Sequence, residues 1–171
     1  GVPFHSYETY MARLVAKGYK VAICEQTEDP AAAKGLVKRE VIRIVTPGTN
    51  LDMQALDESK NNYLMGVVAM DDLFGISVVD VTTGEYRLTE VDGLGKLLDE
   101  INKFMPSELI CNESFYISGV DVEDLKERLG ISISSLAPHY FDQECCKKSL
   151  CRHFSVQTLD GLGLAYLNPN C

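Results

Sequence analysis

The sequence predicts a mixed α/β fold, and three observations support this. Three strand-like runs follow one another closely between residues 62 and 91, with turn residues between them. Helical and strand-like segments then alternate as far as residue 154, and a separate helix with two further strands precedes them within residues 1–50. Closely spaced strands pair as an antiparallel meander, whereas strands separated by helices pair in parallel. We therefore expect one mixed sheet with helices, preceded by a smaller α/β segment.

The first segment opens with an amphipathic helix. Residues 6–18 place apolar side chains at helical spacing, with Ser6 as the expected N-cap and Gly18 as the expected stop. The apolar stripe consists of Tyr7, Tyr10, Met11, Leu14 and Val15. A stripe of this width needs a partner surface, so the helix is expected to pack on the strands that follow it.

Two strands follow this helix. Residues 19–26 form a short apolar run, and residues 37–45 alternate until a turn begins at Thr46. Strict alternation predicts that one face of the second strand carries Val37, Arg39, Val41, Arg43 and Val45. The opposite face is expected to carry Lys38, Glu40, Ile42 and Ile44. Neither face is uniformly apolar, so at least one is expected to be partly solvated.

Residues 51–61 are polar and acidic without an apolar stripe, and we expect a linker there between residues 1–50 and 62–171. The strands expected after it are 62–70, 74–81, 85–91, 107–111 and 131–136. The expected helices are 92–105, 121–130 and 141–154, the second with Asp121 as N-cap and Gly130 as stop. Three antiparallel strands followed by alternating helices and parallel strands are the chain order of a ribonuclease-H-like domain. A further helix is expected to follow the last residues.

Charge divides the chain at the same linker. Residues 1–50 hold seven Lys and Arg against five Asp and Glu, a net charge of +2, whereas residues 51–171 hold nine against twenty, a net charge of −11. A cationic segment attracts phosphate and an anionic one is repelled by it. The two parts are therefore expected to serve different partners.

Composition restricts the cellular setting. No apolar run approaches the roughly 20 residues of a membrane helix, and the first residues do not resemble a signal peptide. The six cysteines are Cys24, Cys111, Cys145, Cys146, Cys151 and Cys171. Reduced thiols in the cytoplasm are expected for them. The group from Cys145 to His153 lacks the paired spacing of zinc ligands, so no metal site is predicted.

Asp80 is the strongest candidate for catalysis. Ribonuclease-H-like nucleases bind divalent metal through a strand Asp together with further carboxylates. The other carboxylates near the expected strand and helix starts are Glu108, Asp142 and Glu144, and none is placed to complete a two-metal site. The alternative role for Asp80 is a strand-end side chain that accepts hydrogen bonds from turn amides. The sequence therefore favours a non-enzymatic protein, with no catalytic residue and no cofactor in this chain.

Four cations lie in or near the second strand: Lys34, Lys38, Arg39 and Arg43. One interpretation is an edge strand protected from aggregation by Lys and Arg. The other is contact with the phosphate backbone of nucleic acid, which needs only charge and reach. Both interpretations remain open from the residue pattern.

Three long blocks resemble a known family. They are "GVPFHSYETYMARLVAKGYKVAICEQTEDP", "KGLVKREVIRIVTPGT" and "NNYLMGVVAMDDLFGISVVDVTTGEYRLTE". In these blocks the chain is similar to bacterial MutS, the DNA mismatch repair family. By this resemblance, residues 1 to 50 correspond to the second half of the mismatch-binding domain. Residues 62 to 171 correspond to the ribonuclease-H-like connector domain.

The resemblance also implies partners. The family binds mismatched double-stranded DNA as a homodimer in an ATP-dependent way, and its connector is thought to relay signals and to dock MutL. The Phe-x-Glu mismatch motif and the ATPase, with its ATP and Mg²⁺, are expected outside this chain. Arg39 is the cation that the resemblance places near the DNA backbone, and Lys38 and Arg43 join it on the basis of charge. The alternative function is a metal-dependent, ribonuclease-H-like nuclease that uses Asp80.

Overall fold

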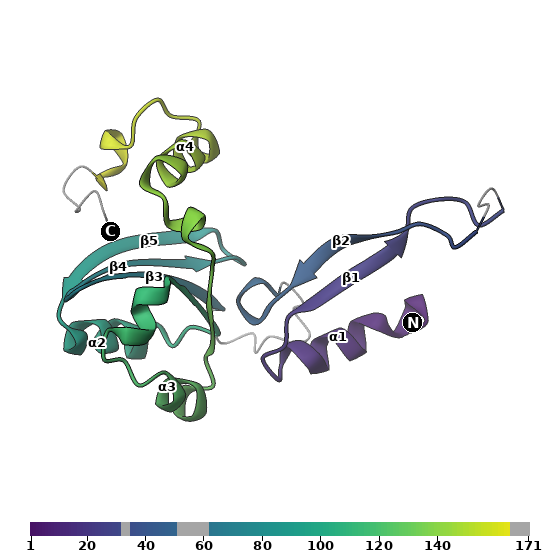
Figure 1. Cartoon of the computed structure of the whole chain (residues 1–171), viewed down its shortest axis with the longest axis horizontal. Coiled ribbons are helices and arrows are strands. Elements are labelled where there is room, and N and C mark those ends of the chain that lie inside the picture. Colours follow the sequence, from purple (N-terminus) through teal and green to yellow (C-terminus); the bar gives the residue numbers. More distant parts are fainter. Residues whose placement is uncertain (32–34, 51–61, 165–171) are drawn as a thin grey trace.

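The computed structural model describes residues 1–31, 35–50 and 62–164. The chain forms two parts that lie end to end (Figure 1). The first is a helix beside a long two-stranded hairpin, and the second is a five-stranded sheet with helices on both sides. The predicted linker at residues 51–61 and the last residues of the chain, 165–171, lie outside the described ranges.

The N-terminal part has its own small core. Its elements are α1 (Tyr7–Val15), β1 (Val21–Gln26) and β2 (Arg39–Val45). α1 buries Met11 and Val15 against Val45, the last residue of β2. The predicted packing of the helix on the strands is thus confirmed, although it occurs only near the base of the hairpin. Farther out, β2 is exposed along its length, including Val41, Ile42 and Ile44.

An irregularity in the hairpin overturns one prediction from the sequence. The antiparallel register pairs Ile23 with Arg43 but Cys24 with Val41, so Ile42 is an extra residue in β2. Ile23 and Cys24 are neighbours and point to opposite faces. The expectation that Arg39, Val41, Arg43 and Val45 share one face is therefore wrong. Arg43 lies on the face of Val45, whereas Arg39 and Val41 lie on the other.

The C-terminal part contains the predicted mixed sheet. Its strands are β3 (Tyr63–Met70), β4 (Leu73–Asp80), β5 (Glu85–Asp92), β6 (Glu108–Cys111) and β7 (Ser132–Ser135). They lie in the order β5-β4-β3-β6-β7. The first three strands pair antiparallel, and β6 and β7 join them in parallel. The fold class predicted from the sequence is confirmed.

Helices lie on both faces of this sheet, but only those on one face bury residues against it. They are α2 (Leu94–Phe104), α3 (Val122–Leu129) and α4 (Gln143–Phe154). α2 and α3 lie on one side, where Leu97, Ile101 and Leu125 pack into a continuous core with alternate strand residues (Figure 1). α4 lies on the other side and buries none of its residues, touching the sheet through a ring contact between Phe154 and Tyr86.

Helix ends follow local chemistry in the C-terminal part. The carboxylate of Asp121 accepts a hydrogen bond from the amide of Asp124, and Gly130 ends the same helix in the left-handed conformation, as predicted. Ser6 does not cap α1 as predicted, because its hydroxyl donates to the carbonyl of Pro3. The wrong prediction arises because a short 3-10 turn, residues Phe4–Ser6, precedes the helix.

The core on the α2 side should dominate the stability of the sheet. We expect Ile101→Ala, at a fully buried position, to lower the free energy of unfolding by about 2–5 kcal/mol, because it removes apolar contacts and leaves a cavity. Urea unfolding followed by circular dichroism measures this loss. Ile117→Ala is the matched control, since that side chain is 86% exposed, and it should cost less than about 0.5 kcal/mol. Equal losses in the two variants would contradict the assignment of the core.

Candidate functional site

Asp80 is a structural side chain at the end of β4. It is only 1% exposed, and its carboxylate accepts hydrogen bonds from the amide of Thr82 at 2.9 Å and from the Thr82 hydroxyl at 2.6 Å. Burial opposes ionisation of Asp80, but hydrogen bonds from Thr82 and Thr83 outweigh it and lower its pKa. This is the turn-bonding role that the sequence offered as the alternative to catalysis.

The sheet keeps Asp80 away from the nearest strand carboxylate, Glu108. Asp80 pairs with Tyr63 across one ladder, and Glu108 pairs with Leu64 across another. Residues opposite each other share a face, whereas the neighbours Tyr63 and Leu64 point to opposite faces. Asp80 and Glu108 therefore lie on opposite faces of the sheet. Within the described ranges, no three His, Cys, Asp or Glu side chains gather as a metal-binding group.

Glu108 joins the two parts of the chain. It is 1% exposed at the start of β6, yet it touches residues that belong to the N-terminal part. One carboxylate oxygen lies 3.2 Å from the ammonium of Lys20, and the other accepts a hydrogen bond from the amide of Gly48 at 3.2 Å. Both oxygens of a buried carboxylate are thereby satisfied by charged or amide donors.

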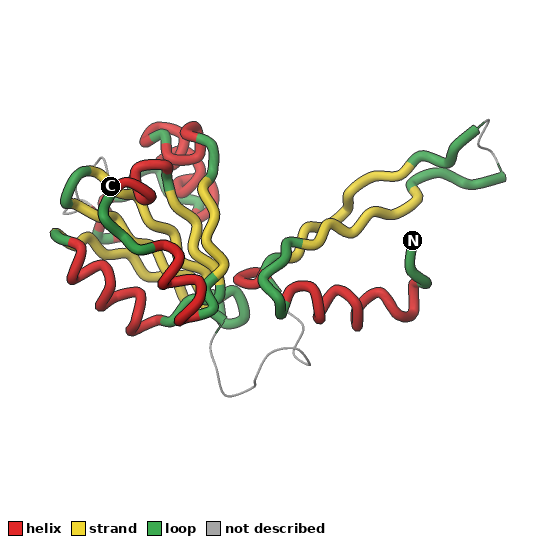
Figure 2. Tube along the Cα trace, turned by 60° about the horizontal axis from the view of Figure 1, so that its bottom comes forward, coloured by secondary structure: helices red, strands yellow, loops and turns green. Residues whose placement is uncertain are grey.

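Further hydrogen bonds surround this contact. Lys20 also donates to the hydroxyl of Ser134 on β7 at 3.0 Å. The side-chain amide of Asn62, just before β3, donates to the carbonyls of Pro47 and Asn50, while its oxygen accepts from Ser107. We call the four residues Lys20, Gly48, Asn62 and Glu108 the interdomain joint. Figure 2 shows the base of the hairpin beside one end of the five-stranded sheet.

Position 48 requires glycine because a side chain would not fit there, and not because of its backbone conformation. It lies in the 3-10 turn Pro47–Thr49, which the side chains of Thr46 and Thr49 fix by mutual hydrogen bonds. A Cβ at position 48 would lie 3.0 Å from the Cβ of Glu108 and 3.1 Å from side-chain atoms of Leu64. The turn can approach β3 and β6 this closely only because it carries no side chain there.

The sequence alone missed this joint. It treated Glu108 as a weak metal-ligand candidate and Gly48 as part of a turn. The available signal was an acidic residue opening an otherwise apolar strand, since such a residue needs a cation if it becomes buried.

The predicted DNA-binding cations lie on the hairpin beyond the joint. Arg39 and Arg43 are exposed on β2, and neither forms an ion pair with any residue in the described ranges. Lys38 pairs with Glu40 at 2.6 Å, and both side chains are exposed. Lys34 lies outside the described residues. The structure therefore brings Lys38, Arg39 and Arg43 onto one hairpin, with Arg39 and Arg43 on opposite faces.

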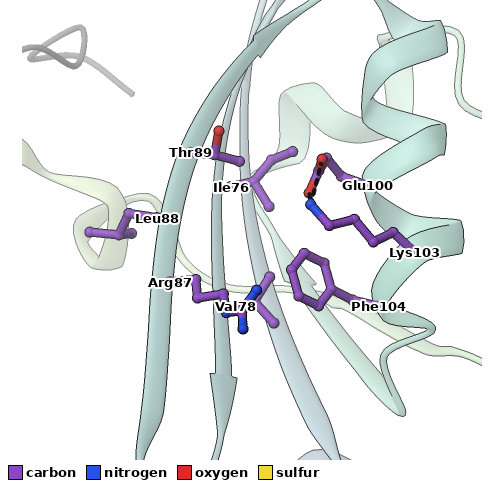
Figure 3. A pocket seen from close by; sticks show the side chains of 8 residues that line it. All are labelled: Ile76, Val78, Arg87, Leu88, Thr89, Glu100, Lys103 and Phe104. Atoms are coloured by element: carbon purple, nitrogen blue, oxygen red, sulfur yellow. Dashed lines mark hydrogen bonds and ion pairs between the residues drawn. The ribbon is translucent and has the colours of Figure 1, made fainter.

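A recess of about 160 Å³ lies between β5 and α2 (Figure 3). The ring of Phe104 is part of its lining, with the guanidinium of Arg87 5.7 Å and the ammonium of Lys103 4.8 Å from the ring centre. Lys103 also pairs with Glu100. These contacts satisfy the charges internally, and the recess is too small and shallow for a substrate-sized molecule.

The cysteines in the described part of the chain do not form a common site either. Five fall within the described ranges, and all five are free thiols. Burial raises the pKa of the Cys111 thiol to about 11, so it stays protonated in the core. Cys146 and Cys151 donate to separate carbonyls, those of Tyr140 and Gln157. Their arrangement offers neither a metal site nor an activated nucleophile.

Comparison with known families identifies both parts. Residues 1–54 match the family model of MutS domain I, and residues 62–170 match that of MutS domain II. The chain belongs to the MutS family of DNA mismatch repair proteins. The five-stranded mixed sheet is thus MutS domain II, the connector. The ATPase domain of MutS lies outside this chain.

Several MutS proteins are similar over nearly the whole chain. The DNA mismatch repair protein MutS of Lachnoclostridium phytofermentans is 58% identical over 164 residues, covering 96% of this chain and 18% of that protein. MutS of Acetivibrio thermocellus is 50% identical over 163 residues, covering 94% and 19%. MutS of Methanococcoides burtonii is 42% identical over 170 residues, covering 98% and 19%. The chain spans about a fifth of the length of these curated relatives.

The lowered pKa of Asp80 predicts how stability of the connector depends on pH. Because the folded state holds this pKa below the ordinary value of 3.8, the ionised carboxylate stabilises the fold above that pH, and the contribution is lost as the pH falls below it. Asp80→Asn should therefore cost about 1–2 kcal/mol at pH 7 and make the acid limb of the stability curve shallower.

Urea unfolding at a series of pH values between neutral and strongly acidic measures both effects. Asp72→Asn, in the exposed turn at the other end of β4, is the control and should change the free energy of unfolding by less than about 0.5 kcal/mol. A stability curve of Asp80→Asn that runs parallel to that of the parent protein down to the lowest pH would refute this role.

Proposed function

We propose that this chain supplies the DNA-backbone-facing arm and the connector of a mismatch repair protein. The observation that carries the proposal is the placement of Lys38, Arg39 and Arg43 on a hairpin that projects away from an acidic connector (Figure 1). The names of the relatives support a role in DNA mismatch repair. The proposed DNA partner is mismatched double-stranded DNA, bound by the longer homodimeric protein with ATP and Mg²⁺ elsewhere in its sequence.

Electrostatics supports phosphate contact by the hairpin. The guanidinium groups of Arg39 and Arg43 are exposed and unpaired within the described part of the chain, so binding phosphate breaks no existing ion pair. Residues 51–171 carry a net charge of −11, which repels DNA and leaves the hairpin as the favourable contact. Contacts to phosphate position a protein without reading base sequence. The chain itself should therefore show little preference for a mismatch.

The connector is proposed to work through protein contact, with MutL as the docking partner. Its edge strand β5 leaves Tyr86 40% and Leu88 36% exposed, which provides apolar side chains among polar ones. A cytoplasmic setting with reduced thiols forms part of the same proposal and agrees with the five free cysteines. None of the helices in the described ranges is both long and apolar enough to span a membrane.

The chain is proposed to be non-catalytic. The nuclease alternative requires Asp80 to meet a second carboxylate, but Glu108 lies on the other face of the sheet. One oxygen of Asp80, Oδ1, is moreover occupied by the amide and hydroxyl of Thr82. No contact in the described ranges favours cleavage over binding.

The salt dependence of DNA binding tests the hairpin. We expect Arg39→Ala and Arg43→Ala each to weaken binding of a labelled duplex and to lower the slope of log affinity against log salt by about 0.9, because each removes one phosphate contact. Fluorescence anisotropy at several salt concentrations measures the slope. Matched and mismatched duplexes should respond alike, since phosphates carry no sequence information.

Arg128→Ala is the matched control. Arg128 is an exposed arginine on α3 of the connector, paired with Asp124, and its loss should leave the slope unchanged. An unchanged slope in both hairpin variants, or strong selectivity of this chain for a mismatched duplex, would reject the proposed role.

A further inference from the structure

The interdomain joint holds the hairpin at both of its ends. Lys20 immediately precedes β1, and Gly48 follows β2 within the turn Pro47–Thr49. The two residues meet on one carboxylate, that of Glu108. Two separate points of attachment at the base of one hairpin restrict rotation as well as translation. A single hydrogen bond would leave rotation about its axis free.

The carboxylate belongs to β6, an interior strand of the connector sheet. β6 pairs with β3 on one side and β7 on the other, and Glu108 opens it opposite Leu64 and Ser132. On β7, the hydroxyl of Ser132 donates to the carbonyl of Gly18, and the hydroxyl of Ser134 accepts from the ammonium of Lys20. A displacement of β6 therefore moves the Glu108 carboxylate. Through this carboxylate it acts on Lys20 and Gly48, the two residues at the base of the hairpin.

Contacts across the joint are mainly polar. Gly48 touches Leu64, but a groove of about 280 Å³ separates α1 and the Pro47 turn from connector residues around Pro106. The ion pair returns little net stability, because desolvation of the buried Glu108 carboxylate offsets its attraction to Lys20, whose side chain stays 41% exposed. Their directional hydrogen bonds nevertheless favour one geometry. The joint thus favours one relative orientation of the two parts, although it adds little to the free energy that holds them together.

The length of the hairpin amplifies any rotation at its base into a larger displacement at its far end. A strand rises roughly 3.3 Å per residue, so the seven residues of β2 span on the order of 20 Å, and a rotation of about 10° at the base moves the far end by about 3–4 Å. Arg39 lies at that far end, whereas Val45 lies at the base. A shift of this size decides whether an arginine reaches a phosphate.

We infer that Glu108 is the positioning residue through which the connector sets the direction of the DNA-facing hairpin, by binding Lys20 and the amide of Gly48 together. The inference deepens the proposed function, on which it rests for the statement that the hairpin faces DNA. The orientation itself can be measured without DNA. Glu108 acts through the hairpin and needs no contact with nucleic acid.

Backbone ¹⁵N relaxation of the 171-residue chain tests the joint. In the parent protein, the N-terminal part and the connector should reorient together. The rotational correlation time of the connector divided by that of the N-terminal part should then be near one. Glu108→Gln and Lys20→Met remove the ion pair from either side, and each should raise that ratio above about 1.5 as the smaller part moves independently. The amide of Gly48 should exchange its hydrogen at least about tenfold faster in both variants.

Controls separate the joint from general effects of charge. Lys126→Met and Glu123→Gln remove an exposed pair on α3 by the same substitutions, and both should keep the parental ratio. Lys20→Arg keeps the cation and should retain most of the coupling. The double variant of Lys20→Met and Glu108→Gln should be no more mobile than Glu108→Gln alone, because the two residues act through one contact.

Gly48→Ala tests the same joint by adding a methyl group where the turn Pro47–Thr49 meets β3 and β6. Its Cβ would press on Glu108 and Leu64 and should push the turn away, again raising the ratio. Gly95→Ala, on α2 with nothing within 4 Å of the added Cβ, is its control. Should Glu108→Gln fail to fold, Lys20→Met and Gly48→Ala test the joint from the N-terminal part.

A ratio that stays near one in Lys20→Met, Glu108→Gln and Gly48→Ala would overturn the inference, as would a ratio well above one in the parent protein. Neither result bears on the salt slopes of Arg39→Ala and Arg43→Ala. Salt slopes that stay unchanged in Arg39→Ala and Arg43→Ala, with an intact joint, would reject the proposed function and leave the positioning role standing.

Discussion

Removing a carboxylate from water costs free energy that donors to its oxygens offset, and the arrangement of the two parts depends on how Glu108 obtains such donors. Glu108 finds a cation and an amide only because the N-terminal part brings Lys20 and Gly48 to the amino end of β6. The same contact joins the base of the hairpin to the start of β6. Without it, the two parts would share a few hydrogen bonds such as that from Ser132 to Gly18.

Charge and geometry act together in this arrangement. The acidic connector repels phosphate, and the hairpin carries arginines away from it on an extended arm. The extra residue at Ile42 turns Arg39 and Arg43 to opposite faces of that arm, so it presents positive charge in two directions. MutS domains I and II thus appear here as an arm and a base, joined through polar contacts that fix direction.

Local patterns anticipated the elements well. Alternation and helical spacing predicted the α-helices and strands of the connector in the correct order over the described residues 62–164, because each pattern reflects one buried face. The roles of Asp80 and Asp121 were also within reach, since each bonds an amide two or three residues away. The prediction failed at Ser6 and at the faces of β2, where a preceding turn and an extra residue interrupt the regular pattern. The roles of the hairpin cations in binding DNA remain predictions.

The sequence by itself determined the mixed sheet, the charge division and the family, because these follow from periodicity, composition and long similar blocks. Only the tertiary structure decided that Glu108 is an attachment point, that Gly48 must lack a side chain, and that Asp80 and Glu108 face apart. The physical reason is the sequence separation of the residues that interact. Glu108 and Gly48 are 60 residues apart, and no local pattern specifies which amide will reach a buried carboxylate once the chain has folded.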